Sequence, residues 1–272
     1  MDKLGLIAGG GDLPGQIAAA CQEKDRPIFA IALKGYADPK NLAGVPHVWV
    51  SLGRPGQALR TLRREGCRDV VMVGRVRRPA PWELWADWTA IRFFTRLGRY
   101  SLGDDGLLRN IVRAIEDEGF RVLSVHEIVK DLRAPTGIWG HYAPSTVDWK
   151  DIRRGQEVAQ ALGCVDVGQA VVVQSGLVLG VEAIEGTDAL LQRCGQLQRT
   201  DRGGVLVKTA KPGQEMRADL PTVGPETVRQ AAAAGLCGIA VQAEKTLVAG
   251  YEETVAAADW AGVFVLGMQV EA

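Results

Sequence analysis

The sequence lacks a long apolar run, a CxxC pair and an excess of charge of either sign. A bilayer-spanning helix needs about 20 apolar residues, and no run of that length occurs. The first residues also lack the apolar stretch, preceded by positive charge, that marks a signal peptide. The 32 basic and 32 acidic side chains cancel, whereas nucleic-acid-binding proteins usually carry a basic excess. We therefore expect a cytoplasmic protein with no nucleic-acid partner.

The cysteines do not form a recognisable framework. There are five, Cys21, Cys67, Cys164, Cys194 and Cys237, and they lie far apart in apolar segments. Their odd number and wide spacing argue against a disulfide framework or a zinc site. We therefore predict buried thiols.

Strand-like and helix-like segments alternate along the first half of the chain. Apolar strands are expected at residues 4–8, 27–33, 47–52, 69–74 and 120–125, and helices at 14–24, 55–66 and 104–119. Repeated βα units with continuous apolar strands are typical of a mainly parallel sheet that is covered by helices on both faces. The pattern therefore predicts an α/β domain over residues 1–135.

The regular pattern lapses around residues 133–145, which contain two prolines and two glycines. We place a linker at residues 136–146 and a second, distinct α/β domain at residues 147–272. Within that domain, two strands at 169–174 and 177–184 flank Ser175 and Gly176, and this spacing predicts a β-hairpin.

A glycine-rich stretch, Gly9, Gly10, Gly11 and Asp12, follows the first strand and precedes a helix. Glycine lets the backbone approach a ligand, and a helix N-terminus favours anions. The dinucleotide fingerprint needs a third glycine where this chain has Pro14, so NAD binding is disfavoured. Two interpretations stay open: a loop that contacts a nucleotide or phosphate, and a tight strand-to-helix turn.

Residues 208–219 hold the densest group of charged side chains that could take part in catalysis. If residues 214–219 are extended, Glu215, Arg217 and Asp219 lie on one face, because side chains alternate along a strand. Two carboxylates beside an arginine can hold a divalent cation, and Lys208 and Lys211 can neutralise phosphate oxygens. The alternative is a solvated loop with surface ion pairs.

Another acidic cluster follows the predicted hairpin. Glu182 interrupts an apolar strand, and burying its carboxylate is costly without a partner. We therefore predict a buried arginine, lysine or metal beside it. Glu185, Gly186 and Thr187 end that strand and begin a helix, where we expect Thr187 to be the N-cap.

Further candidate residues lie near the ends of elements in the first half. Arg77 and Arg78 follow a buried strand at its carboxyl end, where open α/β sheets bind ligands, so either could hold a phosphate; a solvated basic turn is the alternative. Asp105 could supply a carboxylate or cap a helix. Residues 81–97 place three tryptophans on one helix face, which predicts an acyl-chain groove, a membrane-touching helix, or a core or interdomain face.

Five stretches, in order along the chain, resemble the LpxI-type UDP-2,3-diacylglucosamine pyrophosphatases: residues 4–14, 103–109, 118–127, 181–188 and 214–221. The resemblance implies Mg²⁺-dependent hydrolysis of UDP-2,3-diacylglucosamine to UMP and 2,3-diacylglucosamine 1-phosphate, in lipid A synthesis. It implies a Rossmann-like N-terminal domain and a distinct C-terminal catalytic domain, with the lipid between them. It also implies an acylated UDP-sugar substrate and a cytoplasmic enzyme in transient contact with the inner-membrane surface, and it leaves a homodimer open.

The resemblance also selects site residues. Asp219 matches the essential aspartate of the family motif, which Gln214, Glu215 and Arg217 complete. We therefore expect catalytic roles for Asp219, Arg217, Lys208 and Gln214, and Mg²⁺ ligation by Asp219 and Glu215. Substrate contacts are expected from Gly9, Gly10, Gly11, Asp12, Arg78, Asp105, Glu185, Gly186, Thr187 and Lys211. The rival interpretations are a nucleotide-dependent oxidoreductase and a non-catalytic carrier of a lipid or nucleotide sugar.

Overall fold

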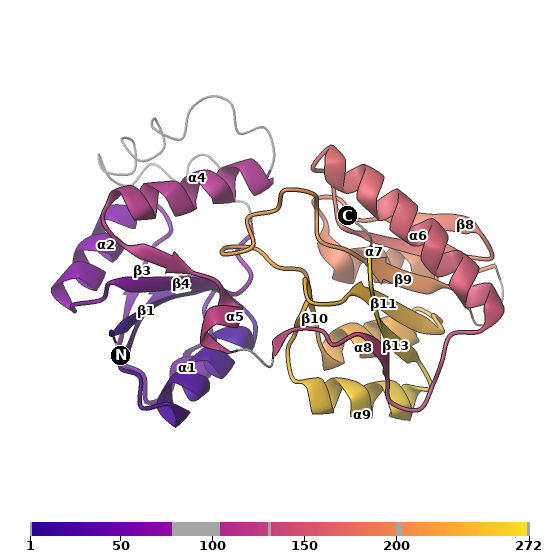
Figure 1. The fold of residues 1–272 in the computed structure, drawn as a ribbon, viewed down its shortest axis with the longest axis horizontal. Helices are drawn as coiled ribbons and strands as arrows, with labels where there is room; N and C mark the ends of the chain where they lie inside the picture. Colours follow the sequence, from indigo (N-terminus) through magenta and orange to yellow (C-terminus); the bar gives the residue numbers. More distant parts are fainter. Residues whose placement is uncertain (1, 78–103, 130–131, 200–202, 271–272) are drawn as a thin grey trace. The chain divides into compact units, whose positions relative to one another are not determined.

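The computed structural model describes residues 2–77, 104–129, 132–199 and 203–270, without the side chains of Asp104 and Asp105. The chain divides into two compact units (Figure 1). The first unit comprises Met1–Asp131 together with Glu215–Asp219, and the second comprises Leu132–Gln214 together with Leu220–Ala272.

The first unit is built on a five-stranded, fully parallel sheet, as the sequence predicts. Its strand order is β3 (His47–Val50), β2 (Ile28–Leu33), β1 (Leu4–Ala8), β4 (Asp69–Val73) and β5 (Arg121–Leu123). Its α-helices are α1 (Leu13–Glu23), α2 (Pro55–Arg64), α4 (Asp104–Asp117) and α5 (Val125–Ile128), and η1 (Pro39–Leu42) is a 3₁₀ turn. Helices α2 and α4 cover one face of the sheet, and α1 and α5 cover the other (Figure 1).

Burial on both faces explains the continuous apolar strands. All six residues of β2 are buried, and Ile31 packs with Leu62 of α2 and Val112 of α4 in one hydrophobic cluster. Strands of a sheet covered on both sides cannot alternate apolar and polar residues, which is why their sequence is almost wholly apolar.

The strand order reverses between β1 and β4, because β2 lies on one side of β1 and β4 on the other. The loops that follow β1 and β4 therefore meet at the carboxyl edge of the sheet. Open α/β sheets bind ligands at such a switch point, so this edge is the part of the first unit that the fold favours for a site.

The second unit contains a mixed, six-stranded sheet. Its order is β6 (Gly137–Trp139), β13 (Phe264–Met268), β11 (Gly238–Gln242), β9 (Val205–Lys208), β7 (Ala170–Gln174) and β8 (Leu177–Val181). Its helices are α6 (Thr146–Cys164), α7 (Gly186–Gly195), α8 (Pro225–Ala233) and α9 (Tyr251–Ala261), and β10 (Thr222–Val223) pairs with β12 (Leu247–Val248) in a small second sheet. The α/β prediction is thus confirmed for both halves.

The predicted hairpin is present between β7 and β8. Ser175 and Gly176 have φ angles of 52° and 80°, and two positive φ values are what a type I′ turn requires. The buried carboxylate of Asp151 accepts hydrogen bonds from both turn amides, at 2.8 and 2.6 Å. Helix α6 therefore fixes the turn in place.

Alternation along β9 decides which side chains face which helices. Val205 and Val207 pack with Ile152 of α6, whereas Leu206 belongs to the cluster that contains residues of α7, α8 and α9. Because side chains alternate along a strand, Lys208 lies on the same face as Leu206.

The structure differs from the expected organisation in several places. The predicted linker contains β6, which pairs antiparallel with β13, and Glu215–Asp219 belong to the first unit. Cys21, Cys67 and Cys194 are buried as predicted, but Cys164 is exposed at the end of α6 and Cys237 is only partly buried. The predicted tryptophan helix lies outside the described residues. Within the described part of the chain, no helix is both long and apolar enough to cross a bilayer.

Candidate active site

The segment with Glu215 and Asp219 forms a compact turn. The backbone N–H groups of Ala218 and Asp219 both donate to the carbonyl oxygen of Glu215, at 3.0 and 2.9 Å. The extended conformation considered from the sequence is therefore wrong. These bonds join residues three and four positions apart, so the one-face alternation of a strand does not apply.

Arg217 is the centre of a charged cluster in the first unit. Its Nε and one terminal nitrogen donate to the two carboxylate oxygens of Glu215, each at 2.8 Å, and its other terminal nitrogen donates to Glu116 at 2.7 Å. The hydrogen bond with Glu215 is the main reason that the pKa of Arg217 is raised, and the bond from Arg217 is the main reason that the pKa of Glu215 is lowered. Glu116 looks like any helix acid in sequence, so only the fold identifies it as a partner.

The contacts of Arg217 affect one of the two expected Mg²⁺ ligands, Glu215. Both carboxylate oxygens of Glu215 are engaged by Arg217. Among the residues that the structure describes, no three His, Cys, Asp or Glu side chains are grouped to hold a metal. Mg²⁺ is usually bound through one or two carboxylates together with substrate phosphates, so a single carboxylate from Asp219 fits that mode of binding.

Lys208 anchors a second polar cluster, at the end of β9 in the second unit. It is 7% exposed, and its ammonium donates to Thr187 Oγ1 at 3.1 Å and to the carbonyl oxygen of Thr222 at 3.0 Å. The Thr187 hydroxyl in turn donates to Glu182 at 2.6 Å. The other carboxylate oxygen of Glu182 accepts from the backbone N–H of Gln169 at 3.2 Å.

These contacts settle two expectations. The buried partner of Glu182 is Thr187, and Lys208 lies one hydrogen bond further along. The prediction that Thr187 caps α7 is wrong: Glu185 occupies the N-cap position without a side-chain hydrogen bond, and the Thr187 hydroxyl is used by Glu182. Thr187 and Glu182 are five residues apart, and the end of β8 brings them together.

Lys211 and Gln214 also make definite contacts in the second unit. The Lys211 ammonium donates to Asp166 at 2.6 Å, and the Lys211 backbone N–H donates to the side-chain oxygen of Gln214 at 2.9 Å. Gln214 donates to the side chain of Gln169 at 3.4 Å. Sequence reasoning missed Asp166, which lies in the loop after α6.

The glycine-rich loop of the first unit packs tightly on another loop. Gly10 and Arg75 exchange backbone hydrogen bonds of 2.9 and 2.8 Å. A Cβ atom on Gly9 would lie 2.9 Å from the backbone of Gly74, and one on Gly74 would lie 2.7 Å from Gly10. Close approach of these two loops, at the switch point of the sheet, accounts for Gly9 and Gly74, whereas a Cβ on Gly11 would meet nothing within 4 Å.

Both halves of the chain match models of one known protein family. The model described as the LpxI N-terminal domain matches residues 3–132, and that described as the LpxI C-terminal domain matches residues 135–266. The chain is also 42% identical over 275 residues to a Caulobacter vibrioides protein named UDP-2,3-diacylglucosamine pyrophosphatase LpxI, with 98% of each chain covered. The chain belongs to the LpxI family. The resemblance drawn from the sequence is thereby confirmed.

Two solved structures show only a distant likeness to this LpxI-family chain. The biotin carboxylase domain of a thermophilic 2-oxoglutarate carboxylase and the biotin carboxylase subunit of a pyruvate carboxylase are each 12% identical, with a TM-score of 0.27. The matches cover 63% and 64% of this chain but only 35% of either relative. At this level they carry no argument about function.

The other expected substrate residues of the LpxI-family chain are distributed as follows. Gly11 has a φ angle of 85°, and its carbonyl oxygen accepts from Asn41 at 2.9 Å. Asp12 is exposed at the N-terminus of α1. Asp105 lies in the first turn of α4, with its side chain undescribed, and Arg78 lies outside the described residues.

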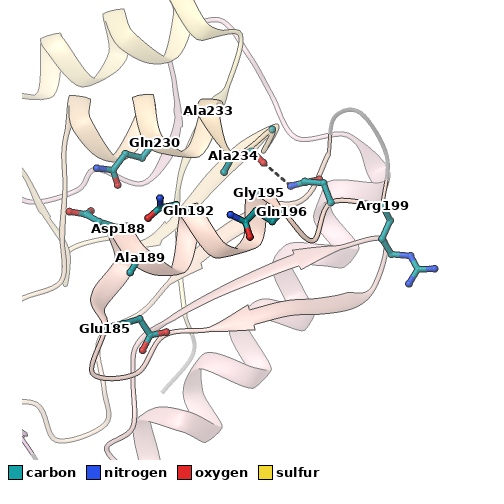
Figure 2. Close-up of a pocket in the computed structure, with 12 residues that line it drawn as sticks. Glu185, Asp188, Ala189, Gln192, Gly195, Gln196, Arg199, Gln230, Ala233 and Ala234 are labelled. Carbon is teal, nitrogen blue, oxygen red and sulfur yellow. Dashed lines mark hydrogen bonds between the residues drawn. The ribbon is translucent and has the colours of Figure 1, made fainter.

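A cavity of about 1060 Å³ runs beside α7 and α8 (Figure 2). Its lining includes Glu185, which also accepts from Arg193 at 2.8 Å. In Figure 2, Asp188 and Gln230 lie at one end of the cavity, and Arg199 points away at the other. Lys208 and Glu182 do not line this cavity, so it is separate from the polar cluster around Lys208.

Proposed function

We propose that this LpxI-family chain hydrolyses the pyrophosphate bond of UDP-2,3-diacylglucosamine, giving 2,3-diacylglucosamine 1-phosphate and UMP in lipid A synthesis. The observation that carries the proposal is the 42% identity, over 98% of both chains, to the Caulobacter vibrioides protein that bears this activity in its name. The polar clusters around Asp219 and Lys208 support it, because both contain side chains suited to phosphate chemistry.

The proposed chemistry relies on charge and positioning. Phosphoryl transfer leaves little covalent work for the protein, which mainly orients the groups and stabilises developing negative charge. We assign Lys208 to the pyrophosphate oxygens, because Thr187 and the Thr222 carbonyl fix its ammonium. We assign Asp219 to binding Mg²⁺ or to orienting the attacking water. When bound, Mg²⁺ would add positive charge at the pyrophosphate oxygens.

The contacts sharpen the roles proposed for the other charged residues. Arg217 is held by Glu215 and Glu116, so we assign it to supporting the turn that ends at Asp219. Lys211 is paired with Asp166, and we assign it to supporting Gln214 and the surrounding loop. We keep the glycine-rich loop and the start of α7 as contacts to the substrate head group.

We further propose that the enzyme works on the cytoplasmic side, in transient contact with the inner-membrane surface. Its proposed substrate carries two acyl chains, and each methylene removed from water contributes about 0.8 kcal/mol. A lipid of this kind resides in a membrane, so the enzyme must meet it there. A homodimer is compatible with this proposal.

One assay tests the proposed function. UMP release from UDP-2,3-diacylglucosamine is measured with Mg²⁺ and with excess EDTA, for the wild type and for Asp219→Asn. We expect Mg²⁺-dependent release by the wild type and a loss of at least about a hundredfold in the variant. Asp117→Asn, an exposed aspartate at the end of α4, is the matched control and should keep full activity.

Three outcomes would contradict parts of the proposal. Full activity in Asp219→Asn would remove that residue from the chemistry. Turnover in EDTA equal to that in Mg²⁺ would show that the reaction does not require the metal. Tight binding of the lipid without any UMP release would favour the rival interpretation, a non-catalytic carrier.

A further inference from the structure

Glu116 and Arg217 are joined across 101 positions of the chain. Arg217 pairs with two carboxylates: that of Glu215 in its own turn, and that of Glu116 in α4. Bidentate arginine–carboxylate pairs are geometrically specific as well as strong. The Glu215 pair therefore fixes the guanidinium relative to the turn, and the Glu116 contact fixes it relative to a helix outside the turn.

Helix α4 is a rigid support for this contact. Val112 and Ile115, on its inner face, are 0% and 3% exposed in the core of the first unit. Ala218, in the turn itself, packs against the same core. The turn is thus held at two points, by the small side chain of Ala218 and by the Arg217–Glu116 ion pair.

We propose that Glu116 is a positioning residue for the reaction, because it holds Arg217 and through it the turn that presents Asp219. The inference rests on the proposed function only in assigning Asp219 to the chemistry. Removing the carboxylate of Glu116 leaves the Glu215–Arg217 pair and both backbone bonds of the turn intact. The turn keeps its internal shape, and its placement on α4 loosens.

Loosened placement has a kinetic consequence. Displacing a reacting group by about 1 Å can cost about a hundredfold in rate, whereas substrate affinity depends on many contacts elsewhere. The loss from Glu116 substitution is therefore expected in kcat, with KM little changed. A purely structural role would instead lower the melting temperature and leave kcat unchanged below it.

The experiment compares Glu116→Ala and Glu116→Gln with the control Glu118→Gln. Glu118 follows α4 and forms an exposed ion pair with Arg63 at 3.2 Å. That ion pair does not involve any residue of the turn. Each protein is assayed for kcat and KM of UMP release, for melting temperature, and for trypsin cleavage of the Arg217–Ala218 bond, followed by mass spectrometry. Trypsin must bind the Arg217 side chain, which Glu116 and Glu215 hold in the folded protein, so we expect cleavage only when the turn leaves α4. Trypsin does not cleave after Lys211, because Pro212 follows it.

We expect both Glu116 variants to be cleaved about fivefold faster, because loss of about 1 kcal/mol raises the small population of detached turn by that factor. We expect kcat to fall about fivefold for a separate reason, because Asp219 is placed less precisely when the turn is attached without the ion pair. The Glu118→Gln control should match the wild type. Unchanged cleavage and kcat in both variants would overturn the proposal, and so would faster cleavage without loss of kcat. If the alanine variant does not fold, the glutamine variant decides. Absence of UMP release by the wild type would refute the proposed function instead. The rate of trypsin cleavage would still show whether Glu116 holds the turn on α4.

Discussion

Lys208 and Glu182 are two buried, oppositely charged residues that share the hydroxyl group of Thr187. A lysine ammonium can only donate hydrogen bonds, so the hydroxyl accepts from Lys208 and gives its single proton to Glu182. The direction of both bonds is fixed by this requirement. The carboxylate thereby orients the hydroxyl, and the hydroxyl orients the ammonium that we assign to the pyrophosphate.

Removal of the shared hydroxyl tests this arrangement. Thr187→Val keeps the shape of the side chain but leaves two buried charges without their link. We expect the free energy of unfolding to fall by about 1–3 kcal/mol, the cost of leaving buried polar groups unsatisfied, and UMP release to fall about tenfold. Thr187→Ser, which restores the hydroxyl, is the control and should recover most of both. Equal losses in the valine and serine variants would refute the role of the hydroxyl.

The Glu215–Arg217 pair makes a pH-dependent contribution to stability. The pKa of Glu215 is lowered in the folded protein, chiefly by the hydrogen bond from Arg217 and against the opposing effect of burial. A carboxyl group of this kind stabilises the fold fully above its unfolded pKa, about 4.3 for glutamate, and loses that contribution as the pH falls through the lowered folded value. The contribution is therefore present at neutral pH and lost in acid.

Urea unfolding of the wild type and Glu215→Gln measures this contribution. We expect their difference in free energy of unfolding to be constant from pH 8 to about pH 5, and to shrink on acidification below about pH 4. The same comparison in an Arg217→Met background is the control, because the main cause of the shift is then absent. A difference that shrinks equally in both backgrounds would contradict the assignment.

The contact between the two loops of the first unit predicts unequal effects of two glycine substitutions. Gly74 has a φ angle of 102° and would bring a Cβ within 2.7 Å of Gly10, whereas Gly11, at 85°, has open space around it. We expect Gly74→Ala to destabilise the protein by about 3 kcal/mol or more, through strain and overlap, and Gly11→Ala by about 1 kcal/mol, through strain alone. Chemical denaturation checks the order, and equal effects would refute the loop contact.

Asp69 marks the opposite, amino edge of the first sheet. It is 3% exposed, and its carboxylate accepts from Arg26 at 2.6 Å and from Arg121 at 2.8 and 2.9 Å. Asp69→Asn should cost about 3 kcal/mol of stability, because a buried ion pair is broken, while kcat stays unchanged in the folded protein. The control Glu65→Gln breaks the more exposed pair with Lys3 and should cost less than about 1 kcal/mol. A selective loss of kcat in Asp69→Asn would contradict a purely structural role.

The architecture could be predicted from local patterns, because the burial of a strand and the conformation of a short turn each restrict the residues of one short stretch of chain. Continuous apolar runs between helices predicted the parallel sheet, and the two residues between strands at 169–174 and 177–184 predicted the β7–β8 hairpin. Strand β6 escaped notice because it is three residues long and follows a proline-containing stretch. It is recognisable only from its pairing with β13.

The candidate site was predictable in its residue types and not in its contacts. Lys208 and Asp219 stood out because they lie in an unusual polar segment, and the family resemblance selected Asp219. Glu116 carries no sequence signal, since exposed glutamates are common on helices. The position of Thr187 at the start of a helix was misleading, because a threonine there is usually the N-cap.

The sequence by itself determined the two α/β halves, the hairpin and the LpxI family, because apolar periodicity, turn residues and motifs are properties of short stretches of chain. Tertiary structure alone decided which distant polar partners the charged side chains meet. Arg217 meets Glu116 across 101 positions, and Lys208 meets Thr187 across 21. Such pairs form because buried or half-buried charges need partners within hydrogen-bonding distance, and only the folded chain brings those partners together.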